Sequence, residues 1–272
     1  MSRALWFMLL WLILPAAAAP AGRIVSLAPH TTEMAAALGL TEQLVGVSER
    51  SDYPSEVANL PTVAGYTGID VEQVMALKPD LVLGWRGGNP PQALAQLRQF
   101  GVPLFLSDAG TPEEIIDELL ELGRLTARQA EAQQLAAALR QRLAALNLRY
   151  GRMPSRPKVF YELWRQPLMT AGKPGWLTPL LARCGADNLF ADIDLPYPQV
   201  ELEIVLQRNP DVIIVGDYDR DYWLHWPQLA AVQSARVHQV APDLLQRMGP
   251  RLIDGLEALC ALIWQDQPPP HP

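Results

Sequence analysis

The sequence predicts an α/β fold in which two lobes are joined by a long helix. Three observations support this prediction. Short apolar segments alternate with helical patterns in both halves, a central stretch shows only helical character, and one short motif occurs on each side of that stretch. Helices between successive apolar strands are typical of βα units, whose strands form a parallel sheet.

The first half contains four short apolar segments that we interpret as buried strands, at residues 23–27, 44–47, 81–83 and 102–106. Helical patterns separate them at residues 31–38, 71–77 and 91–100. Gly39 follows the first of these helices, at a position where glycine commonly ends a helix.

The central stretch, residues 112–150, is rich in the strong helix formers Ala, Leu, Gln, Glu and Arg. Leu135, Leu139, Leu143 and Leu146 recur at helical spacing. Residues 128–150 alone would form a helix of about 35 Å. We expect it to connect two lobes, because it lies near the midpoint of the chain; an ordinary surface helix is the alternative.

The second half resumes the alternation, with strands expected at residues 159–161, 212–215 and 237–240 and helices at 176–184 and 250–264. We therefore divide the chain into a signal peptide (1–19), an N-terminal lobe (20–111), a connecting helical region (112–150), a C-terminal lobe (151–264) and a disordered tail (265–272).

A short motif repeats in the two halves. Glu72 precedes Pro79-Asp80 and an apolar strand, and Glu203 precedes Pro210-Asp211 and another strand, at the same spacing. Its placement in both halves favours duplication of a lobe over chance agreement.

The N-terminus has the features of an export signal. Arg3 is followed by an apolar run at residues 5–14, by Pro15 and by four alanines at 16–19. We expect cleavage near Pro20 and a periplasmic protein. An uncleaved membrane anchor is the alternative. The cleavage region contains no cysteine, so we do not expect a lipid anchor.

Charge and cysteine content restrict the function further. A formal net charge of -7 argues against nucleic-acid binding, which needs a basic face. Cys184 and Cys260 predict one disulfide in an exported chain, with two separate buried thiols as the alternative. Two cysteines alone cannot form a structural zinc site.

Motifs for catalysis are missing from the sequence. There is no Gly-x-Ser-x-Gly elbow, and the glycine-rich residues 84–89 lack the spacing of a phosphate-binding loop. The four histidines do not have metal-ligand spacing, so we expect no enzyme and no metal site. His30 is interpreted as a loop histidine, with a pocket role as the alternative.

Five aromatic residues fall near predicted strand ends or turns: Tyr53, Tyr66, Trp85, Trp164 and Tyr197. Ligands of open α/β sheets bind beyond the carboxyl ends of the strands. As a set, these residues predict flat apolar walls for a large planar ligand. The alternative is that some of them fill the core.

Glu72 and Glu203 are expected near the starts of helices, where the helix dipole favours a carboxylate. That alone would explain them. The more specific hypothesis is two symmetric acidic residues, one per lobe, that contact arginines of a partner with two-fold symmetry.

These motifs together resemble the helical-backbone substrate-binding proteins for iron chelates and corrinoids, and within that family the periplasmic binders of vitamin B12 (cobalamin). The residues that carry the resemblance are 23–29, Thr32-Glu33, 51–54, 76–82, 85–89, 170–173 and 196–200. The most specific segment is Trp85-Arg86-Gly87-Gly88-Asn89. The resemblance covers nearly the whole mature chain.

The resemblance implies two Rossmann-like lobes bridged by a single long α-helix, with cobalamin held in the cleft between them as transported ligand and with no cofactor. The implied ligand-binding residues are Arg50, Tyr66, Trp85, Met169, Tyr197, Asp243, Leu244, Leu245, Gln246 and Arg247. Glu72 and Glu203 match the acidic residues that dock on the permease of an ABC importer, expected to contain two permease and two ATPase subunits. Cys184 and Cys260 match the family's disulfide, and the free protein is expected to be a monomer.

The chain departs from the family pattern at several pocket positions. Arg50 stands where an aromatic residue is expected, Tyr66 and Tyr197 where the best-known member has tryptophan, and Met169 where it has phenylalanine. A different affinity or preferred corrinoid is therefore expected.

Other functions remain open from the sequence. The same scaffold binding a ferric siderophore or haem is the nearest alternative, in which Arg50, Arg86, Arg165 and Arg247 would cluster around an anionic chelate. An exported α/β enzyme and a purely structural periplasmic protein are the more distant alternatives.

Overall fold

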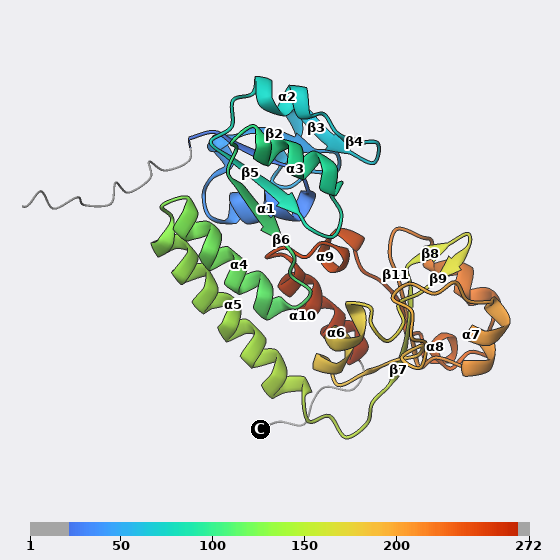
Figure 1. Ribbon diagram of the computed structural model, residues 1–272. Helices are drawn as coiled ribbons and strands as arrows, with labels where there is room; N and C mark the ends of the chain where they lie inside the picture. The colour runs from blue at the N-terminus through green and yellow to red at the C-terminus, as the bar shows by residue number, and fades with distance from the viewer. Residues whose placement is uncertain (1–21, 266–272) are drawn as a thin grey trace, which may run out of the picture.

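The computed structural model describes residues 22–265. Its N-terminal half is built on a six-stranded sheet, whose strands can be followed in Figure 1. The strands are β1 (Ile24–Ser26), β2 (Leu44–Ser48), β3 (Thr62–Gly65), β4 (Gly68–Ile69), β5 (Leu81–Trp85) and β6 (Leu104–Ser107). Their order is β4-β3-β2-β1-β5-β6, and all neighbours are parallel except β3 and β4. Helices α1 (Pro29–Ala37), α2 (Val71–Ala76) and α3 (Pro91–Gln99) and two 3₁₀ turns (Thr41–Gln43, Ser55–Asn59) lie between the strands.

The C-terminal half has a parallel four-stranded sheet in the order β10-β7-β11-β12. Its strands are β7 (Lys158–Glu162), β10 (Asp187–Asn188), β11 (Val212–Val215) and β12 (Val237–Gln239), and a separate antiparallel hairpin pairs β8 (Trp164–Arg165) with β9 (Leu168–Met169). The helices are α6 (Leu177–Arg183), α7 (Leu202–Arg208), α8 (Ala230–Gln233), α9 (Pro242–Gln246) and α10 (Leu252–Ile263), with a 3₁₀ segment at Arg220–His225. The predicted fold class, two α/β lobes, is confirmed.

The connecting region contains two helices, α4 (Pro112–Leu125) and α5 (Gln129–Tyr150), which lie side by side in Figure 1. Thr111 begins α4 by accepting a hydrogen bond from the Glu114 amide at 3.2 Å, a capping interaction. The two helices are separate because Ala127, between them, has a left-handed φ of 57°. The long helix α5 is the element that bridges the two lobes, and it matches the helix expected at 128–150.

The repeated Pro-Asp motif has the same structural role in both lobes. Asp80 accepts hydrogen bonds from the amides of Gly22 and Arg23 at 3.0 and 2.9 Å, where β1 begins. Asp211 accepts one from the Lys158 amide at 2.8 Å, where β7 begins. Each carboxylate therefore fixes the start of the first strand of its lobe, and duplication of a lobe stays a prediction.

A single buried apolar cluster extends through both lobes. It includes Leu83 of the first sheet, Leu139 of α5, Leu256 of α10 and Tyr161 of the second sheet. Separate clusters, around Val82 and around Phe160, cover the other faces of the two sheets. The lobes consequently share a core along α4, α5 and α10.

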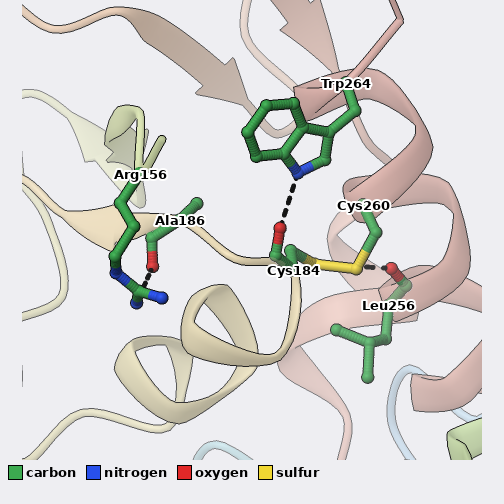
Figure 2. The surroundings of a disulfide bond; sticks show 6 residues. All are labelled: Arg156, Cys184, Ala186, Leu256, Cys260 and Trp264. Atoms are coloured by element: carbon green, nitrogen blue, oxygen red, sulfur yellow. Dashed lines mark hydrogen bonds between the residues drawn. A yellow bond between two sulfur atoms is a disulfide. The ribbon is translucent and has the colours of Figure 1, made fainter. Parts of the chain in front are cut away.

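A disulfide joins Cys184, which follows α6, to Cys260 in α10, as predicted (Figure 2). The Trp264 indole donates a hydrogen bond to the Cys184 carbonyl at 2.6 Å, and Arg156 donates one to the Ala186 carbonyl at 2.9 Å. This end of α10 is therefore fixed to the C-terminal lobe by a covalent bond and a hydrogen bond.

The predicted signal peptide (1–19) lies outside the described residues, as does the predicted tail apart from Gln265. Within residues 22–265, no helix is both long enough and apolar enough to cross a bilayer.

Candidate functional site

The five aromatic side chains expected at strand ends are all exposed. Their exposed fractions are 46% for Tyr53, 100% for Tyr66, 45% for Trp85, 54% for Trp164 and 50% for Tyr197. Because all five are at least 45% exposed, none of them fills the core, and the core-filling alternative is wrong for this set. Exposed aromatic side chains that follow the strands of parallel sheets are typical of a ligand-binding site.

Trp85 is held in its position by the turn that follows β5. The Trp85 amide donates to Asn89 Oδ1 at 2.7 Å, and Asn89 Nδ2 donates to the Leu27 carbonyl at 3.0 Å. The indole lies over Gly88, where an added Cβ would come within 1.9 Å of the Trp85 ring. The segment 85–89 is therefore a platform that presents one tryptophan, because glycine at position 88 leaves room for the ring.

His30 lies in the first turn of α1 and is buried, so its interpretation as a loop histidine is wrong. Its Nε2 is 3.1 Å from the Ser107 hydroxyl, which donates to Glu118 at 2.6 Å. The imidazole meets the Trp85 ring edge to face at 5.5 Å. Burial, aided by the charge of Arg247, lowers the pKa of His30 to about 4, so the ring is neutral at pH 7. A neutral histidine thus supports the Trp85 platform.

Arg247 is surrounded by three carboxylates. Its guanidinium contacts Glu33 of α1 at 3.0 Å, Asp52 of the β2–β3 loop at 2.7 Å and Asp243 at 2.9 Å. The Glu33 and Asp52 contacts link the segment after α9 to the N-terminal lobe. The predicted binding residues Asp243 and Arg247 are therefore brought together, and Arg247 is held in a fixed orientation.

Glu33 is an unusual buried carboxylate at this junction, with an exposed fraction of 2%. Its Oε1 accepts hydrogen bonds from Arg247 at 3.0 Å and from Arg251 at 3.1 Å, whereas its Oε2 has no hydrogen-bond partner among the described residues. Burial raises the pKa of Glu33 despite both arginines. The Arg247 hydrogen bond instead lowers the pKa of the exposed Asp52. Sequence reasoning missed Glu33, Asp52 and Arg251, because their partners are far away in the chain.

Arg251 also connects this junction to the aromatic set. Its guanidinium lies over the Tyr53 ring at 4.0 Å from the centroid, a cation–π contact between α10 and the β2–β3 loop. Tyr53 is therefore fixed beside the Arg247 cluster.

The C-terminal lobe contributes a row of aromatic rings. Trp176 contacts Tyr161 at 6.1 Å and Tyr197 at 5.8 Å between ring centroids. The Trp176 indole donates to the Leu245 carbonyl, and Gln246 Nε2 donates to the Tyr161 hydroxyl at 3.2 Å. Tyr197 is consequently supported by a partly buried network, and Trp176 is a supporting residue that no local sequence pattern indicated.

The remaining predicted ligand-binding residues differ in accessibility. Arg50 and Tyr66 follow the neighbouring strands β2 and β3, and Arg50 has a left-handed φ of 64°. Met169 and Leu244 are half-buried. Leu245 is fully buried in the core, so the structure separates its side chain from the others.

Glu72 and Glu203 occupy equivalent positions. Each is exposed and is the second residue of its helix, α2 or α7, as the sequence analysis expected. Two matching surface carboxylates, one on each lobe, are therefore available to a partner.

No group of three or more His, Cys, Asp or Glu side chains suited to a metal ion occurs among residues 22–265. The accessible chemistry of the junction is aromatic surface, amide and charged hydrogen-bonding groups. Two α/β lobes joined by a helix, with such surfaces at their strand ends, define a binding protein for a small ligand.

Comparison with known proteins identifies the family. Residues 24–241 match the family model described as periplasmic binding protein, and the chain belongs to that family. It is therefore a binding protein and not an enzyme.

Individual relatives are similar over nearly their whole length. The chain is 40% identical over 249 residues to the vitamin B12-binding protein of Vibrio cholerae serotype O1, covering 90% of each chain. It is 40% identical over 256 residues to the vitamin B12-binding protein of Yersinia pestis, covering 92% of this chain and 88% of the relative.

Solved structures agree with this placement. The periplasmic vitamin B12 binding protein of Vibrio cholerae aligns with a TM-score of 0.83 at 40% identity, covering 91% of this chain and 99% of the other. A periplasmic heme-binding protein from Roseiflexus sp. RS-1 aligns with a TM-score of 0.80 at 27% identity, covering 89% and 98%.

Proposed function

We propose that this chain captures cobalamin in the cleft between its lobes and delivers it to the permease of an inner-membrane ABC importer. The observation that carries the proposal is the set of exposed aromatic side chains at the strand ends of both lobes. The vitamin B12-binding proteins to which the chain is 40% identical give further support. Cobalamin is cargo in this proposal, and no cofactor is required.

The chemistry of the site suits a corrinoid. The broad apolar faces of the ring and of its lower base match Trp85, Tyr66, Tyr197 and Met169. Amides at the ring edge can pair with Asp243, Gln246 or Arg247. Arg50 is proposed to hydrogen-bond a side-chain amide or the phosphate of the nucleotide loop.

An anionic ferric chelate or haem is the second candidate, since a heme-binding protein shares the fold at 27% identity. Three of the four arginines that favoured it are neutralised by carboxylates. Arg86 pairs with Asp108 at 3.1 Å, Arg165 with Glu162 at 2.6 Å, and Arg247 with Glu33, Asp52 and Asp243. This pairing favours a ligand of low net charge.

Delivery requires a partner, and Glu72 and Glu203 supply matching contacts on the two lobes. We propose that they bind arginines on two copies of a permease subunit, in an importer with two permease and two ATPase subunits. The free protein is proposed to be a monomer that acts in the periplasm after its signal peptide is removed.

Calorimetric titration of the purified mature protein with cyanocobalamin tests the proposal. We expect one-to-one binding with a submicromolar Kd. Titrations with haemin and with a ferric siderophore serve as comparisons. Binding of either of these with no heat from cyanocobalamin would replace the proposal by the second candidate.

A further inference from the structure

The β8–β9 hairpin places a second tryptophan beside a proposed ligand-binding residue. Trp164 is directly opposite Met169 in this antiparallel pair, and such residues present their side chains on the same face. Leu168, which precedes Met169, packs against the core of the C-terminal lobe. Because successive side chains in a strand alternate, Met169 and Trp164 share the face turned away from that core.

This hairpin is joined to the segment that carries Tyr197. Met169 forms an antiparallel bridge with Gln199, two residues after Tyr197, and the Val200 amide donates to the Leu168 carbonyl at 2.9 Å. Figure 1 shows the hairpin at the side of the C-terminal lobe turned toward the N-terminal lobe. Trp164 is therefore adjacent to Met169, and the strand of Met169 borders the segment that carries Tyr197.

The exposed indole of Trp164 is nevertheless fixed. Its Nε1 donates to the Gln166 carbonyl at 2.8 Å, and its ring meets Tyr218, which follows β11, edge to face at 6.0 Å. The Arg165 guanidinium lies over the Tyr218 ring at 4.9 Å and is anchored to the buried Glu162 at 2.6 Å. A side chain that is already ordered loses little entropy when it contacts a ligand.

We propose that Trp164 is an additional ligand-binding residue, which stacks on a flat apolar surface of the bound molecule. Its indole N–H is already paired with Gln166, so it offers the π face and no free donor. This role rests on the proposed function and adds one aromatic contact surface to the same site. It predicts that affinity depends on aromatic area at position 164.

Calorimetry with cyanocobalamin on the full mature chain tests this role. Trp164→Ala is expected to weaken binding by about tenfold, within the range of aromatic contacts, and Trp164→Phe to restore most of the affinity. Phe100→Ala is the matched control, because Phe100 is 55% exposed at the end of α3, and it should leave Kd unchanged.

Thermal unfolding of the unliganded variants separates binding from folding. Trp164 is 54% exposed, so Trp164→Ala should keep the midpoint of the wild type. If the midpoint falls, Trp164→Leu, which keeps apolar area without a π face, is used instead and should also weaken binding. Wild-type affinity in a folded Trp164→Ala or Trp164→Leu variant would overturn the role of Trp164 alone. Absence of cyanocobalamin binding by the wild type would overturn the proposed function and this inference together.

Discussion

Arg247 donates a hydrogen bond to Glu33 at 3.0 Å, although the two residues are 214 positions apart in the chain. The pair joins α1 of the N-terminal lobe to the segment between α9 and α10. Both side chains are largely buried. The contact is thus a buried ion pair between the lobes and not a surface ion pair.

Removing this ion pair should destabilise the protein. Glu33→Ala leaves Arg247 and Arg251 without a shared buried acceptor, and we expect the free energy of unfolding to fall by about 2–3 kcal/mol. Urea denaturation measures the change. Asp117→Ala is the control, because its pair with Arg140 is exposed and should contribute little. Equal effects of the two substitutions would contradict the role of Glu33.

The Trp85 platform can be tested with two neighbouring glycines. An added Cβ at Gly88 would lie 1.9 Å from the Trp85 ring, whereas one at Gly87 would lie 3.3 Å from it. Gly88→Ala should displace the indole and weaken cyanocobalamin binding by about tenfold or more. Gly87→Ala should have a much smaller effect on Kd in the same titration. A Gly88→Ala protein with unchanged affinity would show that Trp85 does not contact the ligand.

Burial of His30 predicts a dependence of stability on pH. Its pKa is about 4 in the folded protein and 6.5 without the fold, so between these values the unfolded chain binds more protons. His30 therefore does not lower the free energy of unfolding above pH 6.5, and it lowers it progressively as the pH falls from 6.5 toward 4. We expect a loss of about 2 kcal/mol between pH 7 and pH 5.

The variant His30→Gln isolates this contribution, because it cannot take up a proton in that range. Glu33 acts in the opposite direction, since burial raises its pKa in the folded state, and it is retained in both proteins. Urea denaturation should show a weaker pH dependence for His30→Gln than for the wild type. The same pH dependence in His30→Gln as in the wild type would contradict this role of His30.

The disulfide closes a long loop, because Cys184 and Cys260 are 76 positions apart. Replacing both cysteines by serine should lower the free energy of unfolding by about 4 kcal/mol, through the larger entropy of the unfolded chain. Thermal unfolding with and without reductant is the measurement. Reductant should lower the midpoint of the wild type and leave the double variant unaffected; a wild type indifferent to reductant would contradict this.

The docking proposal predicts a separation of transport from ligand affinity. Glu72→Ala combined with Glu203→Ala should reduce cobalamin uptake in cells by at least about tenfold, because charged pairs with the permease are lost. The Kd for cyanocobalamin should not change. Glu121→Ala on α4 is a control for the loss of an exposed acid. Reduced ligand affinity in the double variant would instead place these glutamates in the ligand site.

Local patterns predicted much of the fold. The alternation of apolar segments and helices indicated the βα units, and the Pro-Asp repeat correctly predicted a strand after each copy, β5 and β11. Helix α5 was predicted almost to the residue, because its composition and leucine spacing are strong helical signals. The strands β3, β4, β8, β9 and β10 were missed. The last four contain only two residues each, which are too few to show a period, and β3 contains four.

The candidate site was less predictable. Exposed aromatic residues at strand ends were predicted, because a residue that directly follows a strand of a βα unit lies at the carboxyl edge of the sheet. The burial of Glu33 was not, because it depends on arginines more than two hundred positions away. Likewise, no local pattern distinguishes Leu245, which faces the core, from Leu244 beside it.

Helix α10 gives the molecule a second connection between its lobes besides α5. Arg251, at its start, binds Glu33 of the N-terminal lobe, and Cys260 near its end is bonded to Cys184 of the C-terminal lobe. Arg142 of α5 joins the two connections by pairing with Asp254 and Glu257 at 2.6 Å. A site preorganised in this way spends little free energy on ordering when a ligand arrives, which favours slow dissociation. Fast release of the ligand would then require free energy from a binding partner, because separating the lobes would break the charged pairs between them.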